Sequence, residues 1–275
     1  MNLLFAALIV AATTAIAVTA MLFVRRRAPE GSYFADGDRA SGVFGVLATG
    51  FSVLLGFIVF LAFESYDQSR VGAETEALVL AQQVETAQFF PRAAGRDLTG
   101  ELVCYGRSVI NLEWPRAEAQ KRANEINPWG AEMFRTLQTV HPQTPSQQSA
   151  YDKWLDQTSD REAARSDRIH GAVGVIPSPL WVVLFFISIV IFVYMLFFAD
   201  SGEGVYTQAL LMGAVASVVV GMLLLIRFLD SPFHTGVGGV RPVAMERTLR
   251  IIDDELRIAN QDIVLPCDER GEPTS

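Results

Sequence analysis

Four stretches of this sequence contain no Asp, Glu, Lys or Arg, and each is 20 to 22 residues long. They are Leu3–Val24, Val43–Phe63, Leu180–Ala199 and Val205–Ile226. An α-helix rises about 1.5 Å per residue and the hydrocarbon core of a bilayer is about 30 Å thick, so about 20 apolar residues span it. Helices that are apolar on every face are typical of membrane proteins. We therefore predict an all-α integral membrane protein with four transmembrane helices.

The composition and the first stretch fit this interpretation. Of the 275 residues, 51% are hydrophobic and 19% are charged, whereas soluble domains carry about a quarter charged residues. A cleaved signal peptide begins with positive charge and has an apolar core of about 7–15 residues. Here Met1 and Asn2 are uncharged, and Arg25-Arg26-Arg27 follows the apolar stretch. We predict an uncleaved anchor.

The polar parts of the chain predict the remaining organisation. A short loop occupies residues 25–42, and a polar segment at 64–177 separates the second span from the third. Helix formers without proline follow Glu64, so we expect the second span to continue as a stalk to about Phe90. Proline and glycine breaks then delimit further helices, which together form a helical extramembrane domain. These predicted helices cover residues 93–113, 116–125, 128–139 and 146–170.

The polar tail at 227–275 carries one clear pattern. Apolar residues recur there at alternating intervals of four and three, which places them on one helical face and predicts an amphipathic helix over about 242–263. They are Met245, Leu249, Ile252, Leu256, Ala259 and Ile263. This stripe packs either on the protein's own domain or against a neighbouring subunit or other protein partner.

Charge asymmetry predicts the orientation in the cell membrane. The short loop carries Arg25, Arg26, Arg27 and Arg39, and positive charge in short loops marks the cytoplasmic side. Both termini and the 64–177 domain are then expected outside the cytoplasm. The acidic turn at 200–204 opposes this orientation, as do arginines close to the membrane on the other side. Those arginines are Arg161, Arg165, Arg168, Arg227 and Arg241.

The two cysteines, Cys104 and Cys267, share one compartment in this topology. Outside the cytoplasm that compartment is oxidising, so a disulfide is one alternative. Two buried free thiols are the other. Two cysteines provide neither a disulfide framework nor a thiolate cluster for zinc.

Small residues follow one face of two spans. The fourth span carries Ala209, Gly213, Ser217 and Gly221 at intervals of four, a spacing that lets helix backbones approach closely in lipid. The second span carries a looser series that serves either helix packing or a pore lining, and its hydroxyls either line a wet path or bond to their own helix. That series is Ser41, Gly45, Thr49, Ser52 and Gly56. The third span is rich in bulky aromatic residues and is expected to face lipid.

Charged residues gather where the second and fourth spans end. Glu64 and Asp67 leave the second span, Arg227 and Asp230 leave the fourth, and Glu76 follows in the stalk. Both groups lie on the same side of the membrane, so pairing of Glu64 with Arg227 is geometrically feasible. In an oligomer, a ring of such charges biases ion selectivity. The alternative is an interfacial salt bridge.

Several classes of function are disfavoured. The spans hold no ionisable side chain at mid-membrane depth, which argues against a proton-coupled transporter. A net charge of −8 without a basic stripe argues against nucleic acid as a partner. His141, His170 and His234 are scattered and form no metal-binding spacing. With no nucleophile–base pairing or phosphate-binding loop, we expect neither an enzyme nor a cofactor.

Several motifs resemble a widespread prokaryotic membrane family that is labelled bestrophin-like. The resemblance covers about residues 3 to 252 and is most specific at Glu74-x-Glu76-Ala77 in the stalk and at the Asp230-x-Pro-Phe segment after the fourth span. Ser41 to Phe57, Glu113-Trp-Pro115 and Tyr151 to Asp160 also fit. Phe63 stands where the family has a tryptophan, and His234-Thr235 adds a residue before Gly236. We find no match to the hydrophobic neck that gates true bestrophins.

The resemblance implies kinship with oligomeric anion channels. The first hypothesis for function is therefore a homo-oligomeric ion channel or passive conduit, supported by the small-residue faces and the boundary charges. The alternative is a membrane-anchored scaffold or accessory subunit that transports nothing and binds partners through its domain and tail helix.

Overall fold

The computed structural model describes residues 3–119, 127–259 and 263–274. The chain separates into two compact units. The membrane unit comprises Met1–Ser65 and Val175–Asp230, and the extramembrane unit comprises Tyr66–Gly174 and Ser231–Ser275. Helix α2 (Gly37–Ala87) contributes its first part to the membrane unit and its second part to the extramembrane unit.

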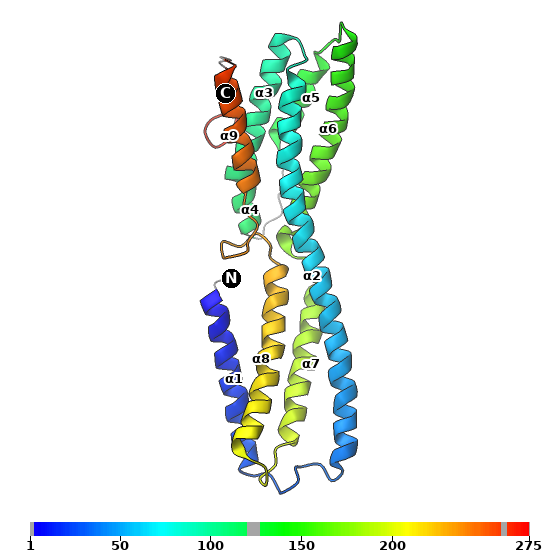
Figure 1. The fold of residues 1–275 in the computed structure, drawn as a ribbon, viewed down its shortest axis with the longest axis vertical. Helices are drawn as coiled ribbons and strands as arrows, with labels where there is room; N and C mark the ends of the chain where they lie inside the picture. Colours follow the sequence, from blue (N-terminus) through cyan, green and yellow to red (C-terminus); the bar gives the residue numbers. More distant parts are fainter. Residues whose placement is uncertain (1–2, 120–126, 260–262, 275) are drawn as a thin grey trace. The chain divides into compact units, whose positions relative to one another are not determined.

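Among the described residues, four helices are long and apolar enough to cross a membrane, which confirms the predicted all-α membrane fold (Figure 1). They are α1 (Leu3–Arg25), α2, α7 (Ser178–Phe197) and α8 (Val205–Leu229). Helix α2 begins before the apolar stretch that marks it, because the carboxylate of Asp36 accepts the Arg39 backbone N–H at 3.0 Å and caps the first turn.

The core of the membrane unit is made by one face each of α2, α7 and α8. Its buried side chains are aliphatic and aromatic, and they are Phe51, Leu55, Ile58, Leu184, Ile191, Val219, Leu223 and Ile226. Helix α1 packs along α8. In the third span, Phe185 and Phe186 are exposed in the protomer, and their contact with lipid stays a prediction, whereas Tyr194 is half-buried. The Tyr194 ring stacks on Phe44 with centroids 5.6 Å apart, and its hydroxyl donates to the Ala40 carbonyl.

The extramembrane unit is helical throughout the residues that the structure describes, apart from loops and one isolated bridge. Its helices, besides the end of α2, are α3 (Arg92–Ser108), the π-helical turn η1 (Val109–Glu113), α4 (Trp114–Glu118), α5 (Pro128–Gln138), α6 (Pro145–His170), the 3-10 turn η2 (Gly171–Val173) and α9 (Val243–Ile258). The helix expected over 116–125 is only partly described: α4 ends at Glu118, and residues 120–126 lie outside the described residues.

The tail helix α9 is shorter than the pattern predicted and packs within its own unit. It ends at Ile258, and residues 260–262 lie outside the described residues. Met245 and Ile252 are buried in the core beside α3, with Leu249 and Leu256 packed at its margin. Ala259 is exposed. Most of the apolar stripe is therefore covered by the chain itself and does not require a protein partner.

Candidate functional site

The uncovered surface of α2 in the membrane unit contains a row of small and hydroxyl residues, with exposed valine and phenylalanine side chains beside it. Gly45, Thr49, Ser52 and Gly56 all lie on this face and are exposed. A Cβ atom added to either glycine would meet no atom of the described chain within 4 Å. The Ser52 hydroxyl donates back to the Ala48 carbonyl at 2.9 Å. We call these four residues the open α2 face; the opposite face of the helix is buried in the core.

The small residues of α8 have a different environment. The Ser217 hydroxyl lies 2.9 Å from that of Thr14 on α1. A Cβ added to Gly213 would lie 3.4 Å from the Thr14 methyl group, which is ordinary van der Waals contact. Gly221 has open space instead. Gly213 and Ser217 thus serve close packing of α8 on α1, in keeping with the general role of small residues between membrane helices.

The charged residues expected at the membrane boundary have different surroundings. Asp230 is buried at the end of α8, where one carboxylate oxygen accepts the backbone N–H groups of Val175 and Ile176 at 2.8 and 3.0 Å. It thereby fastens the segment that enters α7 to the end of α8. Glu64 is exposed and Asp67 half-buried. The assignment of Glu76 as a boundary charge is wrong, because it is fully buried inside the extramembrane unit.

Glu76 belongs to a buried ionic cluster centred on Arg168 of α6. The Arg168 guanidinium is fully buried; its Nε donates to Glu76 Oε2, and its Nη2 donates to Glu113 Oε2 at 2.6 Å. The Tyr105 hydroxyl donates to Glu76 at 2.6 Å. Arg165 donates to Glu113 Oε1 at 3.1 Å. We call Arg168, Arg165, Glu76, Glu113 and Tyr105 the ionic cluster; it joins α2, α3, η1 and α6.

Pairing of opposite charges, rather than burial, determines the direction in which the pKa values of Glu113 and Arg168 are shifted. Burial by itself would raise the pKa of Glu113, but the charges of Arg168 and Arg165 outweigh burial and hold that pKa below its usual value. The pKa of Arg168 is raised: burial opposes the charge, and the carboxylates of Glu76 and Glu113 more than compensate. Both charges are therefore maintained in a dehydrated interior.

The ionic cluster depends on a close approach of α2 to α6. A Cβ added to Gly72 would lie 2.5 Å from the Arg168 backbone nitrogen and 2.8 Å from the Ala164 carbonyl oxygen, so only glycine fits between the two backbones. The ionic cluster was not predicted from the sequence, because the buried face of α6 carries polar residues and therefore does not stand out as an apolar stripe. The buried residues of α6 nonetheless follow the same four-three spacing that marked the tail helix. They are Ala150, Trp154, Gln157, Arg161, Ala164 and Arg168.

A separate buried carboxyl, Glu101, lies on α3 where it faces α5. Burial raises its pKa to about 7, although a hydrogen bond of 2.6 Å from the Thr136 hydroxyl acts in the opposite direction. Unlike Glu113, this group has no arginine within salt-bridge distance among the described residues. Glu101 and Glu113 are therefore shifted in opposite directions from the usual pKa of a glutamate.

The end of the chain is fastened to α3 by a disulfide. Cys104 and Cys267 are bonded, with Cα atoms 5.8 Å apart, so the structure contains the disulfide alternative. Arg107 donates to the Asp268 carbonyl at 3.1 Å, and the Trp129 indole donates to the Gly271 carbonyl at 2.8 Å. Gly271 has a φ of +85°, and a Cβ there would lie 2.3 Å from the Ser108 nitrogen. Residues 265–274 thus form part of the domain surface.

The arrangement of four spanning helices with α2 continuing into a helical domain matches a known family. A family model described as a bestrophin-like domain matches residues 3–245. The chain belongs to the bestrophin-like family. No curated protein matches it.

Solved structures show the same fold as this bestrophin-like chain. A point mutant of a bacterial bestrophin homologue from Klebsiella pneumoniae is 14% identical, with a TM-score of 0.60 over 91% of this chain and 97% of that one. A mutant whose structure is described only as that of a membrane protein is also 14% identical, with a TM-score of 0.61 over 94% and 99% of the two chains. At this identity the likeness concerns the fold alone.

Proposed function

We propose that this bestrophin-like chain forms a homo-oligomeric ion conduit in which the open α2 face lines the pore. The observation that carries the proposal is that this face consists of glycines and hydroxyl residues, is exposed, and has open space beside both glycines in the described protomer. The family membership and the shared fold support the same function.

The physical argument rests on what lipid and water each favour. A helix surface of Gly, Ser and Thr gains little from contact with acyl chains, whereas it packs well on another helix or faces water. Around a symmetry axis, Thr49 and Ser52 would present hydroxyl dipoles to a passing ion. The apolar stretch 43–63 contains no ionisable group, which fits passive conduction.

The alternative function, a membrane-anchored scaffold, is no longer supported by the tail helix. It required an uncovered apolar stripe on the tail helix, and Met245 and Ile252 of that stripe are buried in their own unit. Homo-oligomerisation through the membrane unit remains part of the proposal, because the open α2 face needs a neighbour or water.

A cysteine placed on the open α2 face tests the pore. The protein carrying S52C, in liposomes, is expected to pass ions and to lose about 90% of the flux when a charged methanethiosulfonate reagent is added, because a fixed charge in the pore repels like ions. Flux of several anions and cations is recorded with ion-sensitive dyes. The native cysteines are joined to each other and do not react.

The matched control is V182C, at an exposed position on α7. Its flux should be unchanged by the reagent. Absence of flux in the unmodified protein for all ions and voltages would exclude the conduit, and equal block of both variants would exclude the open α2 face as its lining.

We also propose that the protein lies in the cell membrane with its extramembrane unit outside the cytoplasm. The Cys104–Cys267 disulfide supports this orientation, because such bonds persist in oxidising compartments. The short loop with four arginines supports it independently. Of the arginines that opposed this orientation, Arg165 and Arg168 are paired with carboxylates in the ionic cluster.

Labelling of intact cells tests the orientation. Cys104 is unsuitable because it is buried and bonded. We therefore choose S146C, at an exposed position in the first turn of α6, and S201C, in the exposed turn between α7 and α8. A membrane-impermeant maleimide is expected to label S146C in intact cells and S201C only after lysis. The reverse pattern would place the extramembrane unit in the cytoplasm.

A further inference from the structure

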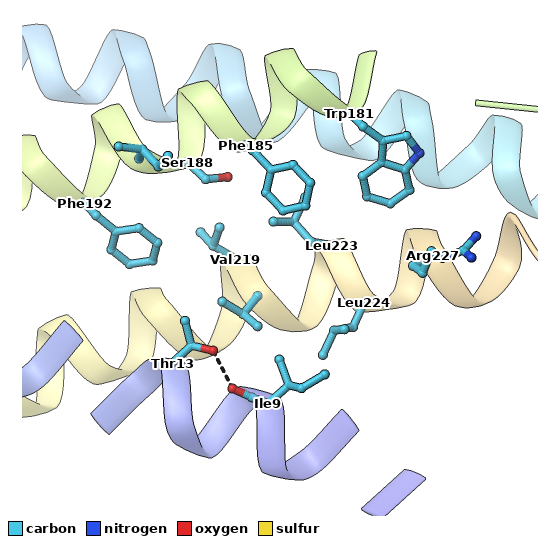
Figure 2. Close-up of a pocket in the computed structure, with 12 residues that line it drawn as sticks. Ile9, Thr13, Trp181, Phe185, Ser188, Phe192, Val219, Leu223, Leu224 and Arg227 are labelled. Carbon is cyan, nitrogen blue, oxygen red and sulfur yellow. Dashed lines mark hydrogen bonds between the residues drawn. The ribbon is translucent and has the colours of Figure 1, made fainter. Parts of the chain in front are cut away.

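An apolar groove runs along the membrane unit between α1, α7 and α8, with a volume of about 720 Å³ (Figure 2). Its walls are aliphatic and aromatic, with Ile9 from α1, Phe185 and Phe192 from α7 and Leu223 from α8. Phe185 is 52% exposed, so the groove is open along its side. Its volume lies within the range of pockets that hold small organic ligands, about 300–1,000 Å³.

The hydroxyl groups in the walls already have partners. The Thr13 hydroxyl donates to the Ile9 carbonyl, and the Ser188 hydroxyl donates to the Leu184 carbonyl at 2.8 Å. Among the described residues that line the groove, the single ionic group is Arg227. A groove whose hydroxyls bond within their own helices offers nothing to water along its length, so an apolar occupant is favoured there.

The dimensions of the groove match one leaflet of a bilayer. Arg227 and Trp181 mark the end of the groove where α8 stops and α7 starts, and Figure 2 shows both at the same end. At about 1.5 Å per residue, the wall from Trp181 to Phe192 is about 16 Å long, and that from Arg227 to Val219 about 12 Å. Half of a hydrocarbon core of about 30 Å is about 15 Å. The groove is therefore long enough to reach from the membrane interface to the middle of the bilayer.

We propose that the groove binds one acyl chain of an anionic phospholipid, whose phosphate lies beside Arg227. The apolar walls accept the chain, and the guanidinium at the interface end complements the negative headgroup. Trp181 lies at the same end, at the depth where tryptophan is favoured in membranes. The site requires neither ion conduction nor a particular orientation, so it stands apart from the function proposed above.

Tryptophan fluorescence tests the site directly. The chain has four tryptophans, and Trp114, Trp129 and Trp154 are buried in the extramembrane unit. Quenching by phospholipids with dibrominated acyl chains therefore reports on Trp181. The full-length protein is reconstituted in phosphatidylcholine bilayers that contain a minor fraction of brominated phosphatidylglycerol or of brominated phosphatidylcholine. We expect at least about twofold stronger quenching by brominated phosphatidylglycerol, because a bound anionic lipid is enriched beside Trp181.

Two pairs of variants separate the site from the general lipid surroundings. R227Q is expected to abolish the preference for phosphatidylglycerol, whereas R26Q, an exposed arginine after α1, should retain it. V220F fills the groove and is expected to halve the quenching by the anionic lipid. V218F adds the same bulk at an exposed α8 position outside the groove and should leave the quenching unchanged.

Three results would overturn the proposal. The first is equal quenching of the wild type by the two brominated lipids, which would indicate ordinary surrounding lipid. The second is retention of the anionic preference in R227Q. The third is protection of Trp181 from both lipids together with cross-linking of F185C between protomers, which would show that a second copy of the chain covers the groove.

Discussion

Replacing Arg168 with methionine is expected to lower the free energy of unfolding by about 3–5 kcal/mol, because Glu76 and Glu113 would remain buried without their main partner. Methionine keeps much of the side-chain volume, so the loss comes from unpaired charge. Thermal unfolding of the purified protein, followed by near-ultraviolet circular dichroism, should show a Tm lower by about 6–20 °C.

The matched control is R70M, which breaks an ion pair between Arg70 and Glu74 at 3.6 Å. Both side chains of that pair are more than half exposed, and we expect a change of at most about 0.5 kcal/mol. Adding E76Q to R168M should recover part of the loss, because it removes one of the unpaired charges. A Tm of R168M equal to that of R70M would contradict the central role of Arg168.

The same cluster predicts sensitivity to acid. The pKa of Glu113 is lower in the folded state than in the unfolded state, so its pairing stabilises the fold above about pH 4.5 and the stabilisation is lost as the pH falls through the folded pKa. Glu101 does not mask this effect, because well below pH 4.5 its carboxyl is protonated in both the folded and the unfolded state and contributes no pH dependence. The Tm of the wild type should therefore fall more steeply than that of R168M below about pH 4.5.

The second large effect is expected from the disulfide. Replacing Cys104 and Cys267 with serine should lower the free energy of unfolding by about 2–5 kcal/mol, because the bond closes a loop between residues 163 apart and restricts the unfolded chain. Thermal unfolding with and without a reducing agent measures the change.

The double serine variant is also the control for the reducing agent, which should lower the Tm of the wild type and leave that of the variant unchanged. Migration on a non-reducing gel shows independently whether the bond has formed in cells. Free thiols in protein prepared without reductant would contradict both the disulfide and the orientation that it supports.

The sequence predicted the helical elements well because each depends on local properties. A span is a helix whose stretch of about 20 residues is apolar on all sides, and that information lies within the stretch. The tail helix followed from its four-three spacing in the same way. Even the start of α2 before Val43 has a local cause, since the capping Asp36 is adjacent in sequence.

The partners of the polar residues could not be predicted, because they depend on which distant segments meet. Glu76 and Arg168 are 92 residues apart, and although the four-three spacing places Arg168 on the buried face of α6, it does not reveal which distant residue Arg168 meets. Asp230 was expected to act as a boundary charge, but it accepts backbone N–H groups 54 and 55 residues away.

The small residues of the second and fourth spans show most clearly the difference between what local sequence predicts and what depends on tertiary contacts. Local spacing marked the stripes of the second and fourth spans alike, because glycine and serine at intervals of four leave a shallow helix surface wherever they occur. Only the tertiary structure shows that Gly213 and Ser217 lie against α1 while the α2 stripe lies open, since contact is a property of the neighbouring helix. The sequence thus determined the four crossings and the helical domain, and the packing of helices determined which polar groups are buried and which face remains available.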